Sequence, residues 1–515
     1  MQPSRLTLAL TLSTVSFAFA APPAENSPRL RELDFSPFQN AFAAFPEARR
    51  TVVTQLIRSS SIPELKAAMA SGSVSSTDLT LAFLLRIQQL DGTLRGYTEL
   101  NPRALEEAAA ADRARAAGQP LGPLHGIPLN LKDNIGTTAP MHTTAGAEIL
   151  LNHSPASNAV VTSNLRAAGA IILGKTSLSE LAGTLTSTPL GSNAVSGAGL
   201  NPYNHSLTPS GSSSGSAITT AAFLTSVSVG TETSGSLLSP GASNGVVAMK
   251  PSRDTVSSTG IIPLVRFQDS AGPIARSVTD AAILLDAIDS TTTDYSASLK
   301  PDALKNIPVG ILRSDLSSPD TKLWLERIDA GLLKAGALPR DASLSGKVGL
   351  LPVVFLGLWQ DSVAYMTSVG LPVKSVPDLI AYNKADAPRR IPRGQNILEA
   401  AAQVIPAVLK DAATSEADAP ALYEKLALEA RSTAANALSD AFKSSGASLL
   451  VSLANRHSDF YATAGFPAIT VPLGLAPDGT PNGITFIARP GEDATLLAHA
   501  FAFEQATRLR ANPPE

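Results

Sequence analysis

Short apolar runs that alternate with helical segments constrain the fold of this chain more than any other feature. Runs typical of buried strands occur at residues 126–134, 170–174, 245–249, 449–453, 468–473 and 483–487. Segments with the pattern of helices lie around them, at residues 79–90, 104–117, 159–168 and 494–508. Short buried strands interspersed with helices are typical of an α/β fold in which helices cover both faces of a sheet. No linker-like break and no internal repeat interrupts the pattern.

Residues 1–20 have the composition of a secretory signal peptide. Arg5 precedes a run of Leu, Val, Phe and Ala that ends in Ala18-Phe19-Ala20, a small-x-small cleavage pattern. An uncleaved membrane anchor is the alternative, but the apolar part is short for a span and serine and threonine interrupt it. No later segment offers an uninterrupted apolar span. We therefore expect cleavage after Ala20, no stable membrane insertion, and a periplasmic or secreted protein.

The composition excludes several classes of function. The chain has no cysteine, which excludes disulfides, thiolate metal sites and a cysteine nucleophile. None of the 6 histidines has the spacing of metal ligands, so we expect neither a metal nor another cofactor. The net charge is −3 and no basic block is present, which argues against a nucleic-acid partner.

Two loops of glycine and serine flank one apolar segment in the middle of the chain. PSGSSSGS covers residues 209–216 and GTETSGS covers residues 230–236, while residues 217–224 between them read as buried structure. Loops of this composition are usually flexible linkers. A run of small residues can instead bend sharply and point successive backbone N–H groups at an oxyanion.

Ser212, Ser236 and Lys132 are the candidate reactive residues. A nucleophilic serine needs a base, and desolvation of a lysine on an apolar strand lowers its pKa enough for that role. Each residue alone has an ordinary explanation: a strand-end lysine, a linker serine and a helix N-cap serine. Their occurrence together favours a catalytic site.

The chain resembles the amidase signature family over residues 60–508. The resemblance depends on many runs at once, because each glycine-serine piece alone is weak. The matching runs are GIPLNLKDNI (126–135), TTAG (143–146), ILGKTSLSELA (172–182), PSGSSSGSA (209–217), GTETSGS (230–236), AMKPS (248–252), STGIIP (258–263), DSAGPIARSVTDAA (269–282), GFPAITVPLG (465–474) and FEQAT (503–507).

This resemblance implies one large α/β domain with a central mixed β-sheet covered by helices on both faces. The expected organisation is a signal peptide at residues 1–20, an N-terminal extension at 21–60 and the amidase signature domain at 61–510. Within that domain, residues 296–446 are more polar and mostly helical in pattern. We expect this variable region to shape the substrate pocket.

The resemblance also implies the chemistry, a serine hydrolase that cleaves carboxylic amide C–N bonds through an acyl-enzyme. The family's Ser–cis-Ser–Lys triad falls on Ser236, Ser212 and Lys132, with a cis peptide between Gly211 and Ser212. A proton passes from Ser236 through Ser212 to neutral Lys132 while Ser236 attacks the carbonyl. The backbone N–H groups implied to hold the oxyanion belong to Thr233, Ser234, Gly235 and Ser236.

Departures from the family pattern leave the substrate class open. The common GGSSGG run is SGSSSGS here, Asp-Thr-Gly-Gly-Ser is replaced by ETSGS at residues 232–236, and Leu238 replaces a frequent arginine. The SSSGS form, TETxGS, GIIP, DSAGP and VPDLIAYNKAD (376–386) look most like the peptide amidase branch, which deamidates C-terminal peptide amides. The alternatives are a general aliphatic or aryl amidase, a non-catalytic binding protein, and a glutaminase-type subunit of an amidotransferase. We expect a small amide or peptide-amide substrate and a monomer or homodimer.

Overall fold

A mixed β-sheet forms the centre of the protein. The structure, a computed structural model, describes residues 29–514 apart from 188–189, 292 and 314–317. The strand order is β1-β3-β2-β6-β8-β7-β12-β13-β11-β9-β10, and β2 is parallel to both of its neighbours, β3 and β6. The strands are β1 Tyr97–Leu100, β2 Pro128–Lys132, β3 Ile171–Thr176, β6 Val227–Glu232, β7 Val247–Lys250, β8 Ser270–Ala275, β9 Pro308–Leu312, β10 Leu338–Ala342, β11 Leu449–Leu453, β12 Ala468–Leu475 and β13 Pro481–Ile487, with a separate pair β4 Ser192–Asn193 and β5 Gly197–Ala198.

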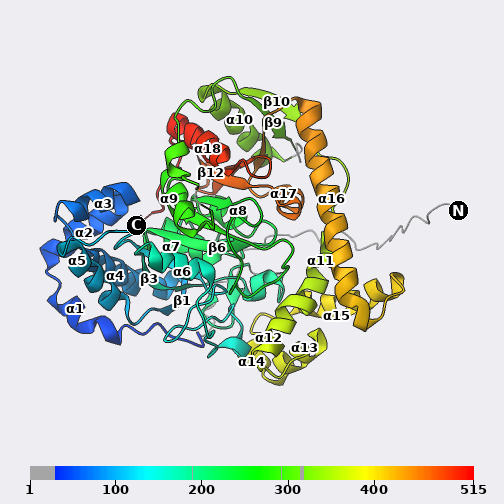
Figure 1. The fold of residues 1–515 in the computed structure, drawn as a ribbon, viewed down its shortest axis with the longest axis horizontal. Coiled ribbons are helices and arrows are strands. Elements are labelled where there is room, and N and C mark those ends of the chain that lie inside the picture. The colour runs from blue at the N-terminus through cyan, green and yellow to red at the C-terminus, as the bar shows by residue number, and fades with distance from the viewer. Residues whose placement is uncertain (1–28, 188–189, 292, 314–317, 515) are drawn as a thin grey trace.

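Helices cover both faces of this sheet, as the alternation of apolar side chains along β11 illustrates. Leu449 and Val451 belong to the core that also contains α9 and α18, whereas Leu450 belongs to the core beneath α16 and α17. Figure 1 shows the two groups of helices on opposite sides of β12. Successive strand residues point to opposite faces, so both faces are buried and the predicted α/β fold is confirmed.

The helix bounds are as follows. The helices are α1 Gln39–Ala44, α2 Glu47–Ser59, α3 Ile62–Ala70, α4 Ser76–Leu94, α5 Ala104–Ala116, α6 Val160–Ala167, α7 Ser214–Ala221, α8 Leu238–Ser243, α9 Val278–Ile288, α10 Pro319–Lys334, α11 Leu350–Gly357, α12 Ala364–Ser368, α13 Val376–Ala385, α14 Ala387–Arg390, α15 Asn396–Asp411, α16 Ala419–Ser445, α17 Ser458–Ala464 and α18 Asp493–Thr507. The apolar segment between the two glycine-serine loops forms α7, and every residue of that helix is buried. The predicted signal peptide at residues 1–20 lies outside the described residues and stays a prediction.

Between β10 and β11 the chain leaves the sheet and builds a helical insertion, α11 to α16, whose apolar core also takes in residues within 145–150, 181–185 and 262–265. Figure 1 shows this insertion beside the sheet, with the long α16 leading back to it. The expectation that residues 296–446 are mostly helical holds for the insertion, but the same region also contributes β9 and β10 to the sheet. The first part of the region therefore belongs to the sheet, and the rest forms the helical insertion.

One helical stretch within the described residues meets the length and hydropathy of a membrane span, contrary to the expectation of none after the N-terminus. It runs through Leu350–Ser368, has a mean hydropathy of 1.2, and is 50% buried inside the protein. Its buried side chains, among them Val353, Phe355 and Leu356, pack in the core of the insertion. Half of the residues in this stretch are therefore already buried by contacts within the protein.

The close contact between α7 and the β3 edge of the sheet gives a stability prediction. A Cβ atom on Gly215 would lie 2.4 Å from the Ser177 nitrogen and 2.4 Å from the Gly96 carbonyl oxygen. We expect Gly215→Ala to lower the free energy of unfolding by about 3 kcal/mol, because rigid backbone must move to admit the methyl group.

Urea unfolding followed by circular dichroism measures this change. Gly92→Ala is the matched control, since nothing lies within 4 Å of the added methyl group in α4. That substitution should raise stability by about 0.5–1 kcal/mol through helix propensity. Equal effects at the two positions would contradict the packing argument.

Candidate active site

The parallel pairing of β2 and β6 places the candidate residues at one edge of the sheet. Lys132 is the last residue of β2 and Glu232 is the last residue of β6. Because the carboxyl ends of adjacent parallel strands meet at the same edge, the loop of residues 233–237 that follows β6 starts beside Lys132. We call this segment the 233–237 loop.

The Lys132 amine is fully buried and has three hydrogen-bond partners. Nζ lies 2.8 Å from Ser212 Oγ, 2.9 Å from Thr231 Oγ1 and 3.1 Å from the Thr231 carbonyl oxygen. Desolvation lowers the Lys132 pKa to about 7, although the negative charges of Asp269 and Glu232 act in the opposite direction. A large fraction of this amine is therefore neutral near pH 7, as a proton acceptor must be.

The structure places Ser212 against this amine and connects its segment to the loop that carries Ser236. The Gly211–Ser212 peptide is cis, as the family resemblance implies. The Ser213 N–H donates to the Ser236 carbonyl oxygen at 3.1 Å, which joins the 209–216 run to the 233–237 loop. Among the described residues, no hydrogen bond joins Ser212 Oγ to Ser236 Oγ directly. The exposed fraction is 0% for Lys132, 3% for Ser212 and 9% for Ser236, so accessibility rises toward Ser236.

The backbone N–H groups of the 233–237 loop are divided between two uses. The N–H groups of Leu237 and Leu238 donate to Glu232 Oε2 at 2.8 and 3.2 Å. Within the part of the chain that the structure describes, none of the N–H groups at residues 233–236 donates to any partner. Buried or half-buried N–H groups are nearly always paired, so unpaired donors beside Ser236 are available to an acceptor such as an oxyanion.

Gly235 lies where this loop meets the segment between β11 and α17. Its φ is +81°, and a Cβ atom would lie 2.7 Å from Asn455 Nδ2 and 3.2 Å from Ser458 Oγ. The Ser234 hydroxyl lies 3.2 Å from that of Ser458. A glycine is therefore required at 235 both for its backbone conformation and for its close contact with Asn455.

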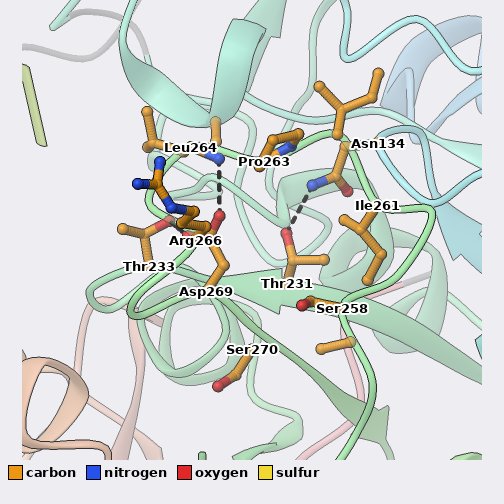
Figure 2. A pocket seen from close by; sticks show the side chains of 13 residues that line it. Asn134, Thr231, Thr233, Ser258, Ile261, Pro263, Leu264, Arg266, Asp269 and Ser270 are labelled. Carbon is orange, nitrogen blue, oxygen red and sulfur yellow. Dashed lines mark hydrogen bonds between the residues drawn. The ribbon is translucent and has the colours of Figure 1, made fainter. Parts of the chain in front are cut away.

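A small cavity of about 50 Å³ opens beside the 233–237 loop. Thr231, which also accepts from Lys132, and Thr233 line the cavity beside Ser270 and Ala271 of the adjacent strand β8, and residues between Ser258 and Arg266 complete its lining (Figure 2). Thr233 Oγ1 donates to Asp269 Oδ1, and Asp269 Oδ2 accepts from the Leu264 N–H at 2.7 Å. Burial raises the Asp269 pKa to about 6. The cavity thus has apolar sides, and its buried carboxyl group links the Thr233 side chain to the backbone at Leu264.

The helical insertion contacts one of the residues that line this cavity. Arg266 lines the cavity and pairs with Asp361 through its guanidinium and, at 2.8 Å, through its backbone N–H. Asp361 lies in a π-helical turn of the insertion, Leu358–Val363, and accepts from the Tyr423 hydroxyl at 2.7 Å. The arginine also stacks over the Tyr423 ring at 4.9 Å. Through these contacts the helical insertion reaches the cavity wall at Arg266.

Lys132, Ser212 and Ser236 were named from the sequence as candidates, but several residues that surround them were missed. Thr231 and Asn134 share a hydrogen bond of 3.0 Å at the cavity edge, yet neither was assigned a role from the sequence. Asp269 and Asn455 were missed as well. Thr231, Asn134 and Asp269 all lie inside runs that match the family, GTETSGS, GIPLNLKDNI and DSAGPIARSVTDAA, so position within those runs was the available signal. Asn455 lies outside every such run.

The comparison with protein families agrees with this geometry. The amidase family model matches residues 78–497, and the chain belongs to the amidase signature family. It is therefore an enzyme of the class that hydrolyses carboxylic amide C–N bonds. A probable amidase of Arabidopsis thaliana is 35% identical over 479 residues, 89% of this chain and 92% of the relative. A glutamyl-tRNA(Gln) amidotransferase component of Moorella thermoacetica is 32% identical over 88% of this chain and 97% of the relative.

Solved structures of the same family superpose over nearly the whole chain. An amidase family protein from Bacillus anthracis has a TM-score of 0.86 at 32% identity and covers 93% of this chain and 97% of its own. The peptide amidase from Stenotrophomonas maltophilia has a TM-score of 0.80 at 37% identity and covers 88% of this chain and 98% of its own. The single-domain architecture is thus shared with amidases of known structure.

Gly235 provides a test of the 233–237 loop. We expect Gly235→Ala to lower kcat/KM for amide hydrolysis on the order of 100-fold, because a shift of about 1 Å in a catalytic loop has that effect. Gly370→Ala is the matched control, since Gly370 also has a positive φ, +85°, but has nothing within 4 Å of its added methyl group. Equal activities of the two variants would show that the Asn455 contact does not fix the loop.

Proposed function

We propose that this protein is an exported serine amidase that removes ammonia from C-terminal peptide amides. The observation that carries the catalytic part is the buried Lys132 amine, which contacts Ser212 at 2.8 Å beside a loop whose N–H groups have no partner among the described residues. The substrate part is supported by 37% identity to a peptide amidase over 88% of the chain. Export is supported by the signal-like sequence of residues 1–20.

The proposed reaction starts with neutral Lys132. Two N–H bonds of the amine point to the carbonyl and hydroxyl oxygens of Thr231, which leaves the nitrogen lone pair for the Ser212 hydroxyl proton. Ser212 in turn takes the proton of Ser236 as the Ser236 oxygen attacks the amide carbon. The negative charge that forms on the carbonyl oxygen is held by N–H groups of residues 233–236, each worth about 3 kcal/mol in such sites.

The second half of the proposed reaction reverses the proton path. The proton returns through Ser212 to the amide nitrogen, the C–N bond breaks, and ammonia leaves while the acyl group stays on Ser236. Water then attacks the ester, its proton follows the same path, and the free acid leaves. The net change is amide plus water to carboxylic acid plus ammonia. The chain supplies every acid and base in this scheme.

A glutaminase-type component of an amidotransferase is the second candidate, because relatives with an amidotransferase name are 32% identical over 88% of the chain. Such a role predicts ammonia release from glutamine rather than from peptide amides. The signal-like N-terminus favours the exported amidase, for which we propose a monomer or homodimer.

The substrate prediction is tested by ammonia release from the chain that begins at Ala21. The panel contains C-terminal peptide amides, simple aliphatic and aryl amides, and glutamine. We expect release from peptide amides and a loss of at least about 1,000-fold in Ser236→Ala, the effect typical of a removed nucleophile. Ser239→Ala is the matched control. Ser239 lies on α8, and the substitution removes a hydroxyl group that is hydrogen-bonded to Ser210.

The panel separates the candidates. Release from simple amides alone would retain the mechanism and discard the peptide-amide substrate. Release from glutamine alone would favour the amidotransferase component, and no release from a folded protein would contradict amide hydrolysis altogether.

The pH dependence tests the role of Lys132. With a Lys132 pKa of about 7, the amine is protonated and inactive below that pH and neutral above it. We expect kcat/KM to rise about tenfold between pH 6 and pH 8, as a single deprotonation requires. Lys132→Arg should lose activity at every pH, because a guanidinium does not release its proton, whereas Lys66→Arg on the exposed face of α3 should retain the wild-type profile. A flat profile in the wild-type enzyme would exclude Lys132 as the base.

A further inference from the structure

Glu232 is a buried carboxylate that no step of the proposed reaction uses. Its side chain is 1% exposed, and Oε2 accepts from the N–H groups of Leu237 and Leu238 at 2.8 and 3.2 Å. The carboxylate therefore spans the loop from the last residue of β6 to the start of α8. This contact closes the turn that contains Ser236.

The position of the Glu232 carboxylate also determines which backbone N–H groups of this turn are paired. Glu232 takes the donors that follow Ser236, while the donors at residues 233–236 remain without partners in the described chain. Without the carboxylate, the N–H groups of Leu237 and Leu238 would be buried and unpaired, since both residues are 0% exposed. Relief of that cost would favour a different turn, in which the N–H groups of residues 233–236 take other positions.

Among the residues that the structure describes, the second Glu232 oxygen has no hydrogen-bond partner, although it is buried. Its charge faces titratable groups on several elements. Lys132 on β2 and Lys250 on β7 are both stabilised in their charged forms by Glu232, and Tyr461 on α17 also interacts with it. Asp269 on the cavity wall is the other carboxylate that acts on Lys132. An unpaired carboxylate oxygen in this position acts on its surroundings through charge rather than through a hydrogen bond.

We infer that Glu232 is a positioning residue with two effects: it holds the 233–237 loop in the shape that presents the oxyanion donors, and it supplies negative charge beside Lys132. This inference rests on the proposed function, because it assigns Glu232 a role in the same proton path. A glutamate that only closed the loop would produce the first effect without the second.

The two effects predict different behaviour for two substitutions. Glu232→Gln keeps an oxygen that can accept from Leu237 and Leu238 but removes the charge, so the Lys132 pKa falls further below about 7. Glu232→Asp keeps the charge but is shorter by one methylene group, so the loop loses its closure. The first variant should change the pH dependence, and the second should change the rate.

The test measures the reaction of Ser236 with a fluorophosphonate, followed by intact mass spectrometry between pH 5 and pH 9. This probe needs an activated serine but no knowledge of the natural amide. We expect half-maximal labelling of the wild-type protein near pH 7, in line with Lys132. In Glu232→Gln the midpoint should move about one unit lower. In Glu232→Asp the midpoint should stay and the plateau rate should fall at least about tenfold.

Glu180→Gln is the matched control, because Glu180 is also a buried glutamate that accepts a backbone N–H, from Ala194 at 2.8 Å. Its midpoint should equal that of the wild-type protein. If Glu232→Gln does not fold, the double variant with Lys250→Met removes the ammonium group that would lack a counter-charge, and the same midpoint shift is required of it.

An unshifted midpoint in Glu232→Gln, with wild-type labelling intact, would overturn the inference and leave the amidase proposal standing. An unchanged rate in Glu232→Asp would overturn the closure of the loop. Absence of labelling in the wild-type protein at every pH would overturn both the inference and the activation of Ser236.

Discussion

The burial of the Lys132 amine is the interaction on which the rest of the site depends. A charged ammonium at this depth is costly, and the cost is reduced because the amine loses its proton near pH 7 rather than near pH 10. The neutral amine still needs partners, which Ser212 and Thr231 supply. Those partners come from elements that must meet at one edge of the sheet, and this requires the adjacent parallel strands β2 and β6 and the small residues around them.

The sequence was sufficient to predict the strands whose residues are continuously apolar. β2, β11, β12 and β13 were expected from their Leu, Val and Ile content, and buried strands of this kind read as apolar runs. β6 was missed because VSVGTE mixes small and polar residues with only two valines. β8 was missed for a similar reason: it contains Pro273 and Gly272, and a Cβ at Gly272 would lie 2.0 Å from the Met249 carbonyl oxygen. Close backbone contacts require small residues, and a strand made of small residues lacks the apolar run by which a buried strand is predicted.

β10 was missed because it is an edge strand whose residues are mostly exposed. Its parallel partner β9 lies in the region expected to be helical. A strand of this kind is specified by its neighbour rather than by its own side chains. The helical pattern of the surrounding residues therefore concealed the outer end of the sheet.

The candidate residues Lys132, Ser212 and Ser236 could be named from the sequence because their chemistry and spacing match a known family. Their surroundings could not, because they depend on which backbone groups remain unpaired and on contacts such as that of Gly235 with Asn455, which are far apart in the chain. Such contacts follow from the assembled fold. One example is the 233–237 loop and the residue after it: the N–H groups of Leu237 and Leu238 donate to Glu232, whereas those of residues 233–236 have no partner in the described part of the chain.

The helical insertion leaves the sheet after β10 and returns at β11, and its contact with the cavity wall includes the cluster of Arg266, Asp361 and Tyr423. Because the insertion has both of its ends on the sheet, a change within α11 to α15 can alter the cavity wall through Arg266 without moving the strands that hold Lys132 and the 233–237 loop. The wall and the sheet edge are therefore mechanically separable parts of one domain.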